Sequence, residues 1–153
     1  MSWRPRPRAS NVGAVLDFLP MPGVIFILED DEAVRDSLRL LLESRAYEVR
    51  AFATGEDFLA RAELAAGDCV VLDYDLPGVD GVAVLARLRE RGFAKPVVFV
   101  SGRADGDVRA AAARLDARAF FDKPVPSEAL LAALAEAVGE RPRPRTGPRP
   151  PVQ

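Results

Sequence analysis

Acidic, hydroxyl and basic residues stand at the ends of four short apolar runs in this sequence. The acids Glu29–Glu32 follow the first run, Asp73 ends the second, Ser101 ends the third and Lys123 follows the fourth. Carboxylates brought close together repel one another unless a proton or a cation neutralises them. Mg²⁺ suits such a group, because it prefers oxygen ligands and is usually held by one or two carboxylates plus a phosphate. A lone acidic run more often caps a helix, but the four positions together favour Mg²⁺-dependent phosphate chemistry.

The elements that must position these residues follow from the apolar pattern. Short β-branched runs alternate five times with helical patterns, which predicts an α/β fold with a doubly wound parallel sheet. The strands are expected at Val24–Leu28, Val49–Ala53, Cys69–Asp73, Val97–Ser101 and Ala119–Phe121. The helices are expected at Asp31–Ser44, Thr54–Arg61, Gly81–Arg91, Asp105–Leu115 and Ser127–Gly139. Ligands of open parallel sheets bind beyond the carboxyl ends of the strands, where the acids, the serine and the lysine stand.

Two helix ends carry local signals. Thr54 precedes Asp57 by three residues, a spacing that predicts a hydroxyl cap at the start of a helix. Ser127 is the expected cap of the last helix, and Gly139 is its expected end.

Composition narrows the function classes. The chain has 153 residues with a hydrophobic fraction of 49%, enough for the core of one domain. It contains no histidine, which excludes Ser-His and Cys-His catalysis, histidine metal ligands and a phosphohistidine role. The lone Cys69 lies in an apolar run and is expected to be a small core residue in a reducing compartment. No run approaches the roughly 20 apolar residues of a membrane span, so we expect a cytoplasmic protein without membrane contact.

The charge is unevenly distributed along the chain. The net charge is −2, yet the flanking segments are rich in arginine and proline and hold one acid, Asp17. The segment between the flanks is therefore acidic, which argues against specific nucleic-acid binding there. We expect a flexible extension over residues 1–22, a domain over residues 23–140 and a disordered tail over residues 141–153. Val12–Leu19 is the apolar patch of the extension.

Four segments together resemble CheY-like receiver domains of bacterial response regulators, and most of all the FixJ-type subgroup. Ile27–Arg35 is similar to the acidic start of such domains, and Val70–Gly81 to their phosphoacceptor strand and the loop after it. Pro96–Gly102 resembles their hydroxyl-bearing fourth strand, and Phe120–Pro124 matches their lysine motif. The segments occur in the family's order and with ordinary spacing over residues 24–140. The resemblance implies a five-stranded parallel sheet in the order 2-1-3-4-5 with five helices.

The resemblance also implies a set of metal ligands and a phosphoacceptor. Asp73 would carry the phosphoryl group as an acyl phosphate. Asp30 and Asp73 would bind Mg²⁺ directly, Glu29 would bind it through water, and the backbone carbonyl of Asp75 would complete the protein ligands. A histidine kinase or a histidine phosphotransferase would be the phosphoryl donor.

Lys123 and Ser101 would bind phosphoryl oxygens, and Phe120 would then turn inward to alter the face of the last strand and its neighbouring helices. Because Phe120 lacks a hydroxyl, burial alone is expected to set its position. The family usually makes the Lys123–Pro124 peptide bond cis. Asp116 replaces the usual glycine at the end of the fourth helix and is expected in a left-handed conformation.

Three other functions fit parts of the sequence. A haloacid-dehalogenase-like phosphatase also uses two aspartates spaced as Asp73 and Asp75 are, but it places further acids after its lysine. A phosphorylation-independent pseudo-receiver would only dock a partner, although the complete set of carboxylates, hydroxyl and lysine speaks against it. A transcription factor would need a DNA-binding segment, and the 13 residues after Glu140 are too few for one. We therefore expect a downstream protein target and no specific nucleic-acid partner.

Overall fold

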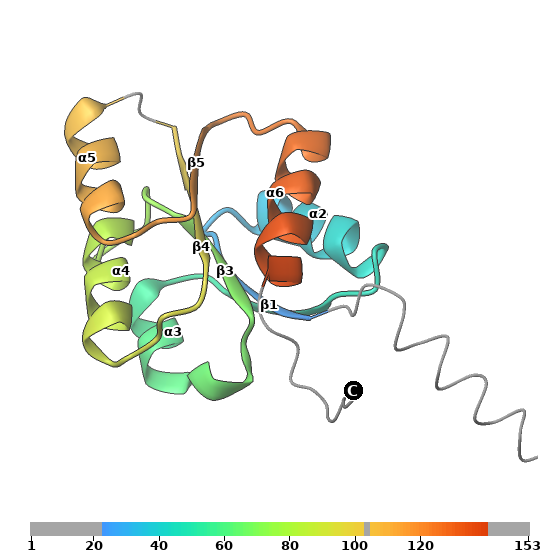
Figure 1. Ribbon diagram of the computed structural model, residues 1–153, viewed down its shortest axis with the longest axis horizontal. Helices are drawn as coiled ribbons and strands as arrows, with labels where there is room; N and C mark the ends of the chain where they lie inside the picture. Colours follow the sequence, from blue (N-terminus) through green and yellow to red (C-terminus); the bar gives the residue numbers. More distant parts are fainter. Residues whose placement is uncertain (1–22, 103–104, 141–153) are drawn as a thin grey trace, which may run out of the picture.

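The computed structural model describes residues 23–102 and 105–140. Five strands alternate with helices in this part of the chain (Figure 1). The strands are β1 (Val24–Leu28), β2 (Glu48–Phe52), β3 (Cys69–Asp73), β4 (Val97–Ser101) and β5 (Ala119–Asp122). The α-helices are α2 (Glu32–Glu43), α3 (Gly55–Arg61), α4 (Gly81–Glu90), α5 (Gly106–Arg114) and α6 (Ser127–Glu140), and a short 3₁₀ helix spans Leu64–Ala66.

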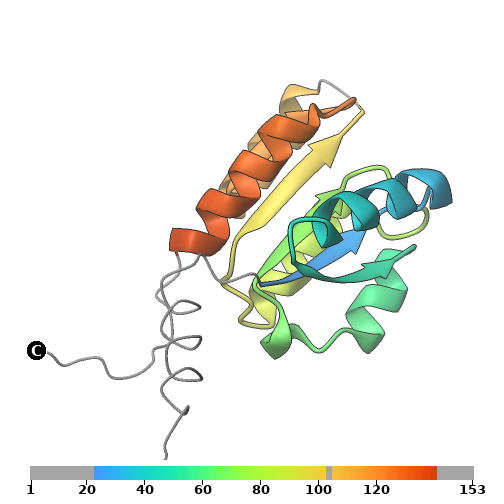
Figure 2. The same cartoon turned by 90° about the vertical axis from the view of Figure 1, so that its right-hand side faces the viewer.

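The sheet has the predicted topology. All neighbouring strands pair in parallel in the order β2-β1-β3-β4-β5, so the expected fold is confirmed. Helices α2 and α6 cover one face of the sheet, and α3, α4 and α5 cover the other (Figures 1 and 2). Strands β1, β3 and β4 lie in the interior of the sheet, which explains their continuous apolar runs.

Each face of the sheet has its own hydrophobic cluster. Along β1, Phe26 and Leu28 join the cluster beneath α3, α4 and α5, while Ile25 and Ile27 join the cluster beneath α2 and α6. The alternation follows from the two-residue period of a strand. Both clusters are fully buried at the strand centres, so β1 and β3 form a rigid base for the polar residues at their carboxyl ends.

The helix ends confirm two of the four local predictions. The Thr54 side chain accepts a hydrogen bond from the Asp57 amide at 3.0 Å, as its spacing predicts. Asp116 has φ 61° in the turn after α5, in the left-handed conformation that was expected. The predictions for the last helix are wrong at both ends, because Ser127 is the first residue of α6 and not the cap before it, and α6 continues past Gly139 to Glu140. One glycine costs a helix only about 1 kcal/mol, which packing of Leu134 and Ala137 in the core offsets.

The expected flexible extension and the expected tail, residues 1–22 and 141–153, lie outside the described residues. Within residues 23–102 and 105–140, no helix is both long and apolar enough to cross a bilayer.

Candidate functional site

The polar residues singled out in the sequence meet at the carboxyl edge of the sheet. Glu29 and Asp30 follow β1 and Asp73 ends β3, its neighbour in the sheet. Ser101 ends β4, the next strand, and Lys123 follows β5. The parallel register brings these five positions to one edge, and the structure thus assembles residues that are up to 94 positions apart in the chain.

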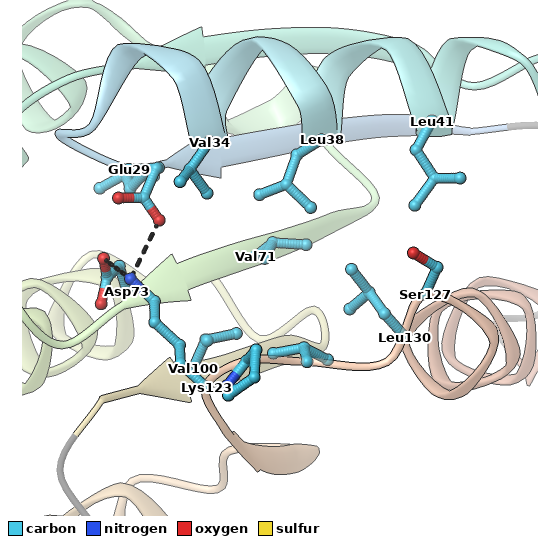
Figure 3. Close-up of a pocket in the computed structure, with 13 residues that line it drawn as sticks. Glu29, Val34, Leu38, Leu41, Val71, Asp73, Val100, Lys123, Ser127 and Leu130 are labelled. Atoms are coloured by element: carbon cyan, nitrogen blue, oxygen red, sulfur yellow. Dashed lines mark hydrogen bonds and ion pairs between the residues drawn. The ribbon is translucent and has the colours of Figure 1, made fainter.

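Lys123 is the centre of this arrangement (Figure 3). Its ammonium nitrogen lies 2.7 Å from Oδ2 of Asp73 and 3.2 Å from Oε1 of Glu29. Asp73 and Glu29 are 2% and 3% exposed, so both carboxylates are removed from bulk water. A buried carboxylate without a partner is costly, and the lysine therefore compensates two charges at once.

Asp30 adds a third carboxylate at the solvent side. Oxygens of Glu29, Asp30 and Asp73 lie within 4.8 Å of one another, and Asp30 is exposed whereas the other two are buried. Three carboxylate oxygens that converge at a point open to solvent on the Asp30 side fit a small divalent cation such as Mg²⁺. The single positive charge of Lys123 does not balance the three carboxylates. The site keeps an excess of negative charge and can therefore accept further positive charge.

The backbone around Asp73 is fixed by hydrogen bonds. The Asp75 amide donates to Oδ1 of Asp73 at 2.9 Å, and the Tyr74 amide donates to the Val100 carbonyl at 2.8 Å. The Asp75 side chain accepts a hydrogen bond from the Gly102 amide at 3.1 Å. This link between the loops after β3 and β4 was not predicted, because no residue pattern in the sequence reports it.

Gly81 is a further residue that sequence reasoning missed. A Cβ at this position would lie 2.5 Å from the Asp73 carbonyl oxygen and 2.7 Å from the Tyr74 Cα. Because both contacts are to backbone atoms, a side chain here would displace the strand end that carries Asp73. Its place at the end of the segment Val70–Gly81 was the signal that could have identified it.

Burial and charge act in opposite directions on the titration of this site. Burial, followed by the negative charge of Asp73, raises the pKa of Glu29, and its hydrogen bonds and the charge of Lys123 offset only part of this effect. Burial alone would lower the pKa of Lys123, but hydrogen bonds and attraction from Asp73 and Glu29 together outweigh it and raise that pKa. The site therefore holds its lysine charged and disfavours the charged form of Glu29.

The raised pKa of Glu29 predicts a pH-dependent stability. Glu29 favours folding fully below its unfolded-state pKa of about 4.5, and this contribution is lost as the pH rises through the higher folded-state pKa. At pH 7 and without divalent cations, Glu29→Gln should raise the free energy of unfolding, on the order of 1 kcal/mol. Urea denaturation at pH 4 and pH 7 measures the effect, and the gain should vanish at the lower pH.

Glu136→Gln is the matched control, since Glu136 is exposed on α6. Its stability should change by less than about 0.5 kcal/mol at either pH. Mg²⁺ should stabilise the wild type more than it stabilises Glu29→Gln. A variant that is less stable than the wild type at pH 7 would contradict the proposed excess of negative charge at the site.

Ser101 and Phe120 lie beside this cluster in the adjacent strands. Ser101 is fully buried, and its carbonyl accepts a hydrogen bond from the Lys123 amide at 2.8 Å. Phe120 is half-buried and stacks on Phe99 with ring centroids 5.4 Å apart. The expectation that burial alone positions Phe120 is wrong, because the Arg109 guanidinium carbon lies 4.3 Å from the centroid of its ring.

Residues 25–135 match the family described as the response regulator receiver domain. The chain belongs to this family, as the four sequence segments predicted. The Lys123–Pro124 peptide bond is cis, as the resemblance implied. Receiver domains are regulatory and interact with histidine kinases, and a haloacid-dehalogenase-like phosphatase is not favoured.

Proteins of similar sequence and structure support the assignment to the receiver-domain family. The chain is 37% identical over 114 residues to the transcriptional regulatory protein TdiR of Thauera aromatica, which covers 74% of this chain and 50% of the relative. It is 33% identical over 116 residues to the transcriptional regulatory protein FixJ of Bradyrhizobium diazoefficiens, covering 76% and 57%. A CheY-like receiver domain protein from Methanospirillum hungatei has a similar structure, with a TM-score of 0.71 and 30% identity over 76% of this chain and 94% of that one.

The chain spans about half the length of these two curated relatives. Both carry the name of a transcriptional regulatory protein. The expectation that this chain lacks a specific nucleic-acid partner therefore has no support from its relatives.

Proposed function

We propose that the chain is a response regulator of a phosphorelay and that Asp73 is its phosphoacceptor. The observation that carries the proposal is the Lys123 ammonium, which lies between the buried carboxylates of Asp73 and Glu29 at 2.7 and 3.2 Å. A carboxylate held beside a fixed cation at an open, acidic edge is suited to receive a phosphoryl group, because that reaction depends mainly on positioning and charge neutralisation.

In the proposed reaction an Asp73 carboxylate oxygen forms a bond to phosphorus while the P–N bond of a phosphohistidine donor breaks. The leaving nitrogen keeps the electron pair, and Asp73 becomes an acyl phosphate. Lys123 then donates to a phosphoryl oxygen as a point charge, and the Ser101 hydroxyl donates to another. The protein needs no further catalytic group, and the only reactions that it promotes are its own phosphorylation and dephosphorylation.

Asp30 and Asp73 would hold Mg²⁺ directly, Glu29 through water, and the backbone carbonyl of Asp75 would be the last protein ligand. The convergence of the three carboxylates within 4.8 Å supports this ligand set. When bound, the ion supplies positive charge that offsets the charge of the transferred phosphoryl group.

Acetyl phosphate tests the phosphoacceptor. With this donor and Mg²⁺, the intact mass of the wild type should increase by one phosphoryl group, and Asp73→Asn should remain unmodified because its amide is not a nucleophile. Asp36→Asn, which alters an exposed aspartate of α2, is the matched control and should react like the wild type.

Equal phosphorylation of the wild type and Asp73→Asn would refute the proposed site. An unmodified wild type would favour a pseudo-receiver that only docks a partner. Steady hydrolysis of phosphomonoesters without retained phosphate would instead indicate a phosphatase.

The switch is proposed to involve Ser101, Phe120 and Arg109. Movement of Ser101 toward a phosphoryl group would open space beside β4, and Phe120 would turn into it and leave the Arg109 guanidinium, shifting the population between two packings. Arg109 also forms an ion pair with Asp122 at 2.7 Å, and this pair holds the guanidinium group in place over the Phe120 ring. Beryllofluoride with Mg²⁺, which mimics a phosphoryl group, should therefore shift the amide resonances of Ser101 and Phe120 in the wild type and not in Asp73→Asn. Unchanged resonances in the wild type would contradict the switch.

A histidine kinase or a histidine phosphotransferase is the proposed donor, and the cytoplasm is the proposed location. The output is proposed to pass through the face formed by α5, β5 and α6. Two kinds of output remain to be distinguished. One is the binding of a protein target by this face, and the other is the control of transcription, which the names of the relatives suggest.

A further inference from the structure

An apolar cavity lies between α2 and α6 on the sheet face that these two helices cover. Its volume is about 510 Å³, and its floor is formed by residues of β1, β3 and β4. Val34, Leu38 and Leu41 of α2 point into it from one side, and Leu130 of α6 lines it from the other (Figure 3). A compact ligand would be surrounded here on three sides, and small-molecule sites have similar volumes of about 300–1,000 Å³.

Helix α2 leaves part of its apolar face uncovered. Leu42 is the only buried residue of this helix. Val34 is 41% exposed, and Leu38 and Leu41 are half-buried. An amphipathic helix normally packs its apolar stripe against another element, so these side chains offer apolar surface to a ligand. From Val34 to Leu41 the helix advances about 10 Å, a length that an alkyl chain of about eight carbon atoms matches.

The polar end of the cavity is rich in hydrogen-bond acceptors. Glu29, Asp73 and Lys123 form this end, and Asp30 brings a third carboxylate oxygen within 4.8 Å of the other two. Each oxygen of Glu29 and Asp73 accepts one hydrogen bond, either from Lys123 or from a backbone amide. A carboxylate has about four acceptor sites, so within the described part of the chain both acids retain acceptor capacity.

The charge of this end favours a cationic ligand over an anionic one. Lys123 is the only cation among the described residues that line the cavity, and it faces three carboxylates. Two of the three donors of its ammonium group are already directed at Asp73 and Glu29. An anionic group would therefore meet two buried negative charges and a single remaining donor, whereas an ammonium group would meet acceptors and opposite charge.

We propose that this cavity binds an amphipathic organic cation, namely a primary amine with an apolar body. The ammonium group donates to the carboxylates of Glu29, Asp30 and Asp73, and the apolar body lies between α2 and α6. Because its charge sits beside Asp73, such a ligand excludes both Mg²⁺ and a phosphoryl donor from the site, a consequence that rests on the proposed function.

Titration of the full chain with octylamine, at pH 7 in a buffer that contains a chelator, tests the site. The amine is charged at this pH, since alkylammonium groups titrate near the lysine value of about 10.4. It should shift the methyl resonances of Leu38, Leu41 and Leu130 until the site is saturated. Methyl resonances of Val84 and Leu88, which are buried beneath the opposite face, are the internal reference.

Three related ligands separate the contribution of the apolar body from that of the charge. Hexylamine should bind about 15-fold more weakly than octylamine, which corresponds to about 0.8 kcal/mol for each of two buried methylene groups. Octanol should bind about tenfold more weakly than octylamine, because it lacks the charge-assisted hydrogen bonds. Octanoate should cause no selective shift. Octanol or octanoate that binds as tightly as octylamine would overturn the cationic site.

Two pairs of variants locate the two ends of the ligand. Glu29→Gln should weaken octylamine binding about tenfold and leave octanol binding unchanged, whereas Glu136→Gln, at an exposed position of α6, should bind like the wild type. Leu38→Trp should fill the cavity and weaken octylamine binding by at least about tenfold. Leu40→Trp is its control, because Leu40 is 67% exposed on the same helix and does not line the cavity.

The remaining outcomes are also decisive. No shift with octylamine, or shifts of equal size in the cavity and reference methyl groups, would overturn the proposal. Shifts of the cavity methyl groups when the chain is concentrated without any amine would overturn it in favour of a second copy of the chain. The titration uses no phosphodonor, so its failure would leave the proposed phosphoacceptor intact.

Discussion

Replacing Lys123 with Met should lower the free energy of unfolding by about 3 kcal/mol at pH 7 in the absence of divalent cations. The ammonium group lies 2.7 Å from Asp73 and 3.2 Å from Glu29, and both acids are almost fully buried. Removing one partner of a buried ion pair leaves an uncompensated charge, and here it leaves two. Methionine retains the apolar part of the side chain, so the loss reports charge and not packing. Urea denaturation in the presence of a chelator measures it.

The pH dependence of this loss has a defined sign. The pKa of Lys123 is raised in the folded protein, so its stabilising contribution is complete below its unfolded-state pKa of about 10.5 and is lost as the pH rises through the higher folded-state pKa. The difference between the wild type and Lys123→Met should therefore persist from neutral pH to about pH 10 and then shrink. It should also shrink as the pH falls, because protonation of Glu29, whose pKa is raised by burial, removes one of the two negative charges, and it should shrink when Mg²⁺ is added at pH 7.

Lys95 offers a matched control, because it is the other lysine of the chain and also precedes a proline. Its ammonium nitrogen binds the carbonyl oxygens of Ala65 and Gly67 at 3.3 and 2.7 Å, and it contacts no carboxylate of the described residues. Lys95→Met should cost about 1 kcal/mol through its lost hydrogen bonds, and acid or Mg²⁺ should not reduce that cost. If both variants lost the same stability with the same pH profile, Lys123 would not compensate the acidic site.

The fold could be predicted because its signals are local and repeated. The interior strands β1, β3 and β4 are covered on both faces, and so each appears in the sequence as an unbroken apolar run bounded by polar residues. The edge strand β2 is half-buried, and its predicted position differs from the observed one by a single residue. The strand order came from the resemblance and not from the pattern, since alternation alone leaves several orders open.

The sequence predicted which residues meet at the candidate site, but it did not predict the geometry of their contacts. Strand ends define an edge of the sheet, and that rule brings Glu29, Asp73 and Lys123 together. The distances that make Lys123 bridge two acids depend on side-chain packing, which the pattern does not contain. The contact of Arg109 with Phe120 has the same origin, because it joins an exposed face of α5 to β5.

Arg89 shows most clearly what the sequence pattern could not indicate. It lies in the last turn of α4, where a basic residue needs no special explanation. In the structure its guanidinium donates to the carbonyls of Phe93 and Lys95 in the loop before β4, and to the carbonyls of Leu115 and Asp116 after α5, at 2.7 to 3.0 Å. Burial lowers the pKa of Arg89. One side chain thus connects α4, β4 and the left-handed turn at Asp116.

Arg89→Met should lower the free energy of unfolding by about 3 kcal/mol. Four hydrogen bonds are lost, each worth on the order of 1 kcal/mol. Those of the four carbonyl groups that are shielded from water then have no replacement donor. Arg89→Lys should recover only part of the loss, because an ammonium group cannot reach four carbonyls that match the planar guanidinium fork. Urea denaturation of the three proteins measures the series.

Arg87→Met is the control for the loss of a positive charge near the end of α4, since Arg87 is exposed on the same helix turn. It should change stability by less than about 0.5 kcal/mol. An Arg89→Met variant as stable as Arg87→Met would show that the turn at Asp116 holds its conformation without the guanidinium. If the prediction holds, the unfavourable φ of Asp116 is stabilised from α4 as well as by the backbone bonds of the turn itself, since one hydrogen bond to this turn comes from a residue 27 positions earlier in the chain.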